Sequence, residues 1–292
     1  MTQQLPLMLI MALSGHSAVV DVFLMGGQSN MAGISNTALD STAADSNIAY
    51  YYDLDSSASW LTATSGGEFT TLGAATHPNG SPIWGSEITL GRALDAAGYN
   101  TAIVKYSYTG TSLAVEYSSP SSNTSGTGVA WDNMVATYTD ALQDIVGRGD
   151  TPVIRGFFWS QGESDTDTSE RAINYEVNFA ALINDLEAEF ASTYDFSSIQ
   201  YITAQTALNI GTDVANATIV REAQASVMES LPNGTLFDTE DFERRSNDIL
   251  HFSATGYDQM GAAFAEAYLI PEPSSSLLCL LGGGSLFFLR KR

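Results

Sequence analysis

The sequence predicts an α/β protein in which helices cover both faces of a parallel β-sheet. Short apolar runs such as 19–25 and 152–159 are typical of buried strands, and longer segments with apolar residues at helical spacing lie between them. Strands that alternate with helices in this way form parallel sheets buried on both faces. Polar motifs follow the first, third and fourth strands, at the carboxyl ends where open α/β sheets place their functional sites.

The predicted elements alternate along the chain. Apolar, β-branched or aromatic runs predict strands at 19–25, 48–54, 101–106, 152–159 and 201–204. Apolar residues at helical spacing predict helices at 86–97, 131–146, 171–190, 214–231 and 255–269. In helix 171–190, this spacing predicts an apolar face made of Ile173, Val177, Ala180, Ile183 and Leu186. Glycines and prolines interrupt 55–84, which we expect to form a loop at the rim of a substrate cleft.

The first strand ends in a glycine turn that presents a serine, Gly26-Gly27-Gln28-Ser29. A buried strand followed by a tight turn can hold a nucleophilic side chain out of the sheet. Glycine and serine also form ordinary turns, so this pattern is weak by itself. Ser29 is a candidate nucleophile that needs support from elsewhere in the chain.

That support comes from Asp248 and His251, which lie three residues apart near the end of the chain. Serine, aspartate and histidine are the residue types of an acyl-transfer triad, in which the imidazole removes the serine proton and the carboxylate orients the imidazole. The other two histidines lie in the apolar leader and in a Pro/Gly/Asn-rich loop, which makes His251 the best candidate base. The alternative is that Asp248 and His251 cap the helix that begins near Ser253.

The composition excludes several classes of function. The chain has 33 acidic against 11 basic residues and a formal net charge of −22, which disfavours a nucleic-acid partner. Its only cysteine, Cys279, rules out an intramolecular disulfide and a thiolate metal cluster. The sequence contains none of the metal-binding or dinucleotide-binding motifs, so we expect no metal and no cofactor.

Several motifs in the same order resemble the SGNH-hydrolase superfamily, in its branch of sialate O-acetylesterase-like and carbohydrate esterase family 6 acetylesterases. The stretches that carry the resemblance are Gly27-Gln28-Ser29-Asn30-Met31, Val104 to Ala114, Trp159-Ser160-Gln161-Gly162-Glu163-Ser164-Asp165, Val220-Arg221-Glu222-Ala223-Gln224 and Asp248-Ile249-Leu250-His251. The likeness covers about residues 19 to 268. It implies a three-layer α/β/α sandwich with a flavodoxin-like parallel sheet.

The resemblance also implies roles for the site residues. Ser29 would be the nucleophile, His251 the general base and Asp248 the residue that orients His251. The oxyanion would be held by the backbone N–H groups of Ser29 and Gly110 and by the side-chain amide of Gln161. A glycine at position 110 would also let the backbone approach a substrate closely.

Four further residues are candidates for supporting the site or binding substrate, namely Gln28, Asn30, Glu163 and Arg221. Glu163 is either a second carboxylate in the site or a buried partner of Arg221. We favour the pairing, because an unpaired buried carboxylate is costly. Trp131 and Trp159 could stack on sugars, although such residues more often belong to the core.

Both ends of the chain predict export. The apolar run at 5–13 resembles a secretory signal peptide within residues 1–18, although the chain has no basic residue before Arg92. The alternatives are a slightly misassigned start of the sequence and a first helix. The C-terminal stretch 270–292 combines Pro-Glu-Pro, an apolar segment and a basic end. It resembles the PEP-CTERM sorting signal of bacterial surface proteins, which implies processing by an exosortase; a plain membrane anchor is the alternative.

The sequence therefore predicts one esterase domain at 19–269 between a leader and a tail. We expect an exported serine esterase that removes O-acetyl groups from carbohydrates through an acyl-enzyme. The cell surface, extracellular matrix or periplasm of a Gram-negative-type bacterium is the expected location, with initial anchoring in the membrane by the tail. The alternatives are a non-catalytic carbohydrate-binding matrix protein of the same fold and a general short-chain carboxylesterase.

Overall fold

The computed structural model of the protein describes residues 17–270, except 36, 57–61, 124–125, 209 and 212. Almost all of the predicted leader, and all of the predicted tail after Ile270, lie outside the described residues. Cys279 lies outside them as well. Within the described part of the chain, no helix is long and apolar enough to cross a membrane.

A central β-sheet organises the described residues. Eight of their strands form this sheet, in the order β10-β9-β8-β1-β7-β2-β3, with β4 pairing with β2. Neighbouring strands from β2 to β10 are parallel, and only β3 and β4 add to β2 in the antiparallel direction. The bounds are β1 Val19–Gly27, β2 Ala49–Ser56, β3 Ala63–Thr64, β4 Thr70–Thr71, β7 Thr101–Thr109, β8 Thr151–Ser160, β9 Gln200–Gln205 and β10 Gly234–Asp238.

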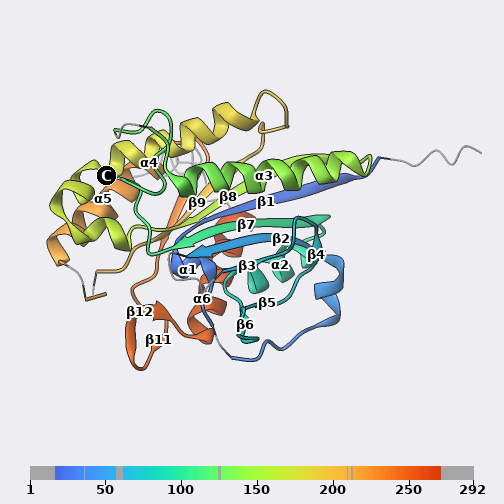
Figure 1. Ribbon diagram of the computed structural model, residues 1–292, viewed down its shortest axis with the longest axis horizontal. Coiled ribbons are helices and arrows are strands. Elements are labelled where there is room, and N and C mark those ends of the chain that lie inside the picture. The colour runs from blue at the N-terminus through green and yellow to red at the C-terminus, as the bar shows by residue number, and fades with distance from the viewer. Residues whose placement is uncertain are drawn as a thin grey trace, which may run out of the picture.

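Helices cover both faces of this sheet (Figure 1). On one face α3, α4 and α5 enclose one apolar core, and on the other α2 and α6 enclose a second core. The bounds are α1 Ser29–Ala32, α2 Glu87–Ala96, α3 Val129–Gly147, α4 Ser169–Phe190, α5 Val214–Ser230 and α6 Ala254–Leu269, with 3-10 helices η1 Ala43–Asn47 and η3 Glu163–Asp167. The predicted three-layer α/β/α fold class is confirmed.

Two hairpins lie outside the central sheet. One pairs β5 (Ala75–Thr76) with β6 (Pro82–Ile83), inside the long segment that was expected to be a loop. The other pairs β11 (Arg244–Arg245) with β12 (Asp248–Phe252) and precedes α6 (Figure 1). The second hairpin carries both Asp248 and His251, so the site depends on how it is attached to the sheet.

The strand order differs in detail from the predicted one. Counted along the chain, the parallel strands lie in the order 2-3-1-4-5-6, so that β7 separates β1 from β2. A flavodoxin sheet has the order 2-1-3-4-5. The strand β10 was also missed, because its five residues are only half-buried and carry a weak apolar pattern. The strand order reverses at β1, because β7 and β2 lie on one side of it and β8, β9 and β10 on the other. The carboxyl ends of β7, β1 and β8 meet there.

The buried face of α4 agrees with the predicted one at Ile183 and Leu186, which are buried, but differs from it in the first half of the helix. Ile173 and Val177 are 65% and 55% exposed, whereas Tyr175 and Phe179 are buried. The ring of Phe179 stacks on Trp159 of β8 at 5.9 Å between centroids. Aromatic side chains bury more apolar area than Ile and Val, so they decide which face of the helix meets the sheet.

Candidate active site

The turn after β1 approaches β8 so closely that it requires glycine. Gly27 has a φ of 150°, and a Cβ there would stand 2.0 Å from the carbonyl oxygen of Ser160. The same oxygen accepts a hydrogen bond from the backbone N–H of Gln28 at 3.0 Å. The turn therefore fixes Ser29 at the start of α1, directly beyond the carboxyl end of β1.

Ser29, His251 and Asp248 form a continuous chain of hydrogen bonds. Ser29 Oγ lies 3.0 Å from His251 Nε2, and His251 Nδ1 lies 2.6 Å from Asp248 Oδ2. The other oxygen of Asp248 accepts the backbone N–H groups of Leu250 and His251 at 3.0 and 3.2 Å. Burial by itself raises the pKa of Asp248, but the hydrogen bond and charge of His251 and the two backbone N–H groups outweigh it and hold the pKa below its usual range.

The helix-cap interpretation of Asp248 and His251 is wrong. The next helix, α6, begins at Ala254, and its N-cap is Ser253, whose hydroxyl accepts the backbone N–H of Gly256 at 3.1 Å. Asp248 and His251 lie on β12 and bond to one another. The strand thus holds the carboxylate against the imidazole and directs the imidazole to Ser29.

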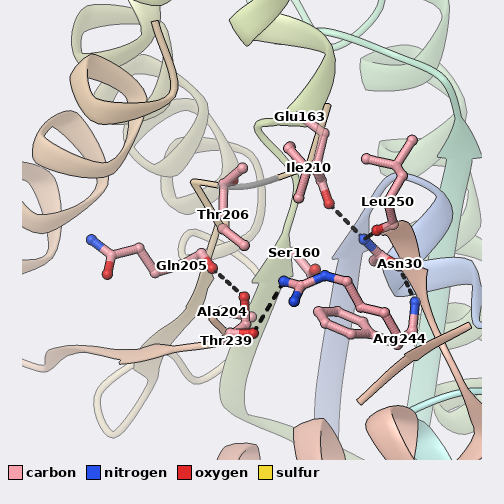
Figure 2. A pocket seen from close by; sticks show the side chains of 12 residues that line it. Asn30, Ser160, Glu163, Ala204, Gln205, Thr206, Ile210, Thr239, Arg244 and Leu250 are labelled. Carbon is pink, nitrogen blue, oxygen red and sulfur yellow. Dashed lines mark hydrogen bonds between the residues drawn. The ribbon is translucent and has the colours of Figure 1, made fainter. Parts of the chain in front are cut away.

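Asn30 ties the serine turn to the strand of His251. Its Nδ2 donates to the carbonyl oxygen of Leu250 at 3.2 Å and to Glu163 Oε1 at 2.7 Å (Figure 2). Its Oδ1 accepts the backbone N–H of Phe252 at 3.4 Å. Leu250 and Phe252 flank His251, so Asn30 holds the strand on both sides of the imidazole.

The predicted pairing of Glu163 with Arg221 is wrong. Arg221 donates to both carboxylate oxygens of Asp238, at 3.2 and 3.1 Å, and to the carbonyl oxygen of Thr206 at 2.8 Å. Arg221 lies on α5 and joins this helix to the ends of β9 and β10. Glu163 bonds to Asn30 instead, which places it in the site as a buried carboxylate.

The side-chain amide of Gln161 is occupied by the protein. Its Nε2 lies 2.6 Å from Asp165 Oδ2, 3.0 Å from the carbonyl oxygen of Thr111 and 3.2 Å from Gln28 Oε1. Two amide hydrogens thus face three protein acceptors. The geometry does not support the predicted role of Gln161 as a donor to an oxyanion, and gives Gln28 and Gln161 the task of joining the turns after β1 and β8.

Gly110 lies just beyond the end of β7 and is exposed, with a φ of 74°. A Cβ built there would meet nothing within 4 Å. The positive φ, and not crowding, is therefore the reason for glycine at this position. Its neighbour Thr111 bonds to Gln161, so the loop lies at the same edge of the sheet as the serine turn.

Asp165 was missed in the sequence although it lies in the same motif as Gln161. It is fully buried and accepts the backbone N–H groups of Leu113 and Ala114 at 3.0 and 3.3 Å, besides Gln161. Burial raises the pKa of its carboxyl to about 7, against the opposing effect of these hydrogen bonds. Asp165 joins the loop after Gly110 to η3.

A buried ion pair supports the far end of α1. Lys105 Nζ lies 2.7 Å from Glu87 Oε2 and 3.0 Å from the carbonyl oxygen of Ala32, and both charged side chains are almost wholly buried. Burial lowers the pKa of Lys105, partly offset by Glu87. The sequence signal was a lysine within an apolar strand, since such a charge needs a partner.

Gln224 of α5 supports the turn after β8. Its Nε2 donates to the carbonyl oxygen of Gln161 at 2.9 Å, and its Oε1 accepts the backbone N–H of Thr206 at 3.0 Å. The same carbonyl oxygen accepts the hydroxyl of Tyr175 at 2.9 Å. Two helices, α5 and α4, therefore fix the backbone of Gln161. In the part of the chain that the structure describes, no cluster of His, Cys, Asp or Glu could hold a metal ion.

The family profile described as "carbohydrate esterase, sialic acid-specific acetylesterase" matches residues 19–270. The chain belongs to this carbohydrate esterase family. The match spans every strand and helix of the described fold and includes the hairpin with His251. Among curated proteins, no sequence matches the chain significantly.

Solved structures share the fold of this carbohydrate esterase. A protein from Arabidopsis thaliana is similar with a TM-score of 0.61 at 20% identity, covering 85% of this chain and 97% of that one. A carbohydrate acetylesterase from Xanthomonas citri gives 0.57 at 22% identity, covering 85% of this chain and 55% of that one. The structure of NanS is similar with a TM-score of 0.61 at 14% identity, covering 87% of this chain and 98% of that one.

We expect Lys105→Met to lower the free energy of unfolding by about 3–5 kcal/mol, because it leaves the buried carboxylate of Glu87 without its counter-charge and with only the backbone N–H of Gly85 as a donor. The double variant Lys105→Met/Glu87→Gln should lose less of its free energy of unfolding than Lys105→Met alone. Urea denaturation measures the free energy of unfolding of both variants. Arg148→Met is the control: Arg148 pairs with Asp144 at the surface, so its substitution should cost about 1 kcal/mol or less. A double variant that loses more stability than Lys105→Met alone would contradict the prediction, because the losses of uncoupled residues add.

The raised pKa of Asp165 predicts a pH-dependent stability. Between pH 3.8, the usual pKa of an aspartate, and pH about 7, the folded protein holds a proton on this carboxyl that the unfolded chain releases. The contribution of Asp165 to the free energy of unfolding is therefore complete below this range and is lost as the pH rises through 7. We expect the free energy of unfolding of wild type minus that of Asp165→Asn to fall by about 4 kcal/mol from pH 4 to pH 8.

Denaturant unfolding at a series of pH values measures this difference. Asp150→Asn serves as control, because Asp150 lies at the surface of the opposite end of the sheet, bonded to the backbone N–H of Ala18. A difference that stays flat or rises with pH would mean that the three donors around Asp165 keep it ionised.

Proposed function

We propose that this protein is a serine esterase that removes O-acetyl groups from carbohydrates through an acyl-enzyme. The observation that carries the proposal is the hydrogen-bonded chain from Ser29 Oγ to His251 at 3.0 Å and from His251 to Asp248 at 2.6 Å. This is the arrangement that a hydroxyl nucleophile, its base and the orienting carboxylate need. Membership of the carbohydrate esterase family supplies the substrate class.

In this mechanism, His251 Nε2 accepts the Ser29 proton as Oγ attacks the acetyl carbonyl carbon. The backbone N–H groups of Ser29 and Gly110 are the proposed donors to the tetrahedral oxyanion. His251 then gives its proton to the sugar oxygen as the bond to the acetyl carbon breaks, so that the sugar leaves as an alcohol and an acetyl group stays on Ser29. Water, activated by His251, attacks that ester and releases acetate. Asp248 holds the Nδ1–H tautomer and stabilises the imidazolium in both steps.

The proposed substrates are acetylated carbohydrates as a class. The family description names sialic acid, and acetyl-xylan or an acetylated exopolysaccharide are further members of the same substrate class. In all of them, the reacting group is an acetyl ester of a sugar hydroxyl. The chemistry described for Ser29 and His251 is the same for each.

We also propose that the esterase acts outside the cytoplasm of a Gram-negative-type bacterium. The support is the sequence of its two ends, the apolar leader at 1–18 and the Pro-Glu-Pro, apolar and basic segments of 270–292. The tail would anchor the protein in the membrane until an exosortase-type enzyme processes it.

Mass spectrometry of the protein recovered from its native cells tests this proposal of export and processing. We expect a mature N-terminus near residue 19 and a C-terminus shortened within 270–292, in the surface or periplasmic fraction. A full-length chain in the cytoplasmic fraction would contradict both parts of the proposal.

We expect Ser29→Ala to lower kcat for an aryl acetate and for acetylated sugars by at least about 10⁴-fold, because it removes the nucleophile. Ser192→Ala, at an exposed position after α4, should keep the wild-type rate. Acetate release measures all three proteins. A Ser29→Ala variant with the wild-type rate would refute the triad, and a folded wild type that is inactive on both kinds of ester would favour a non-catalytic carbohydrate-binding protein.

A further inference from the structure

A small polar cavity lies behind the strand that carries His251. It is bordered by Asn30, Ser160, Glu163, Thr239, Arg244 and Phe252, among others (Figure 2). The space within it that the centre of a water molecule can occupy is about 10 Å³, which is room for about one water. The cavity thus lies between the serine turn, the turn after β8 and the β11–β12 hairpin.

Two of the residues that border this cavity each carry a buried polar atom without a partner. Glu163 Oε2 and Arg244 Nε have no hydrogen-bond partner among the described residues. Glu163 is 8% exposed, and its other oxygen is occupied by Asn30. A buried charged group with unsatisfied hydrogen bonds is costly, so both atoms need a ligand in the cavity.

We propose that one enclosed water molecule bridges Arg244 and Glu163, and that the two residues act through it as positioning residues for His251. The water accepts the Nε–H of Arg244 and donates to Oε2 of Glu163. A water satisfies both atoms because one needs an acceptor and the other a donor. The positioning role rests on the proposed function, in which His251 is the base.

The contacts of the two residues explain why this bridge matters for His251. Arg244 donates to the carbonyl oxygens of Glu240 and Thr239 at 2.9 and 3.3 Å, and its guanidinium lies 5.4 Å from the ring centroid of Phe252. Arg244 also pairs with Phe252 across the hairpin. Arg244 therefore holds the hairpin from one side.

Glu163 holds the same hairpin from the other side. Through Asn30 it is linked to Leu250 and Phe252, the two neighbours of His251. The water completes a ring of contacts that runs from Glu163 through Asn30 and Phe252 to Arg244. The hairpin lies outside the central sheet, with Ile249 58% exposed. This ring therefore adds to its other attachments, which are the burial of Phe252 in the second core and the hydrogen bond from Arg245 to the carbonyl oxygen of Ile34.

The first experiment is a high-resolution crystal structure of the wild-type protein. We expect one ordered water within about 3.2 Å of both Arg244 Nε and Glu163 Oε2. A dry cavity, or a direct bond between the two side chains, would overturn the bridge. This result does not depend on any activity, so it decides on the site even if the proposed esterase function fails.

The second experiment compares kcat and KM for an aryl acetate in Arg244→Met, Glu163→Gln and the double variant. Glu163→Gln keeps an oxygen for Asn30 and removes the charge facing the cavity. We expect each single variant to lower kcat about 10- to 100-fold with KM changed less than about twofold, because the base is misplaced while the binding surface remains. The double variant should lose no more than the worse single variant, since both break the same bridge.

Arg155→Met is the matched control. Arg155 is also a partly buried arginine, but it pairs with Asp21 at the opposite end of the sheet. It should keep the wild-type kcat even where its stability falls. Wild-type kcat in Arg244→Met, or losses that multiply in the double variant, would overturn the positioning role. A wild type without esterase activity would refute the proposed function instead.

Discussion

The fold must hold two side chains that are 222 residues apart within a hydrogen bond of 3.0 Å, Ser29 at the start of α1 and His251 on β12. An error of about 1 Å in such a pair is enough to lower a rate by two orders of magnitude. Ser29 gains its place from the packing of β1 against β8 at Gly27. His251 comes from a hairpin outside the sheet, which is fixed by the burial of Phe252 in the second core and by polar contacts through Asn30.

Many of the buried polar groups near the site help to fix the distance between Ser29 and His251. Asn30 joins the two sides directly, and Lys105 with Glu87 fixes the end of α1. Gln224 fixes the turn after β8 through the backbone of Gln161. Buried polar networks are costly when incomplete and rigid when satisfied, which suits a site that needs fixed geometry.

The sheet topology places these contacts at one edge. The strands β7, β1 and β8 are neighbours, and their carboxyl ends carry the loop of Gly110, the serine turn and the turn of Gln161. Open α/β sheets form their sites where the strand order reverses, because the loops diverge there and leave space. The hairpin with His251 is attached to this same edge.

The sequence by itself predicted the α/β class and the central strands, because strand periodicity is local. It also named Ser29, Asp248 and His251 as candidates, and the structure brings the three side chains together. Tertiary structure decided which polar groups meet. In the folded protein, Glu163 bonds to Asn30 and not to Arg221, and the side-chain amide of Gln161 bonds to other protein groups. Tyr175 and Phe179 of α4 face the core, and β10 extends the sheet. The partner of a buried side chain depends on how distant elements pack, and no local pattern encodes that geometry.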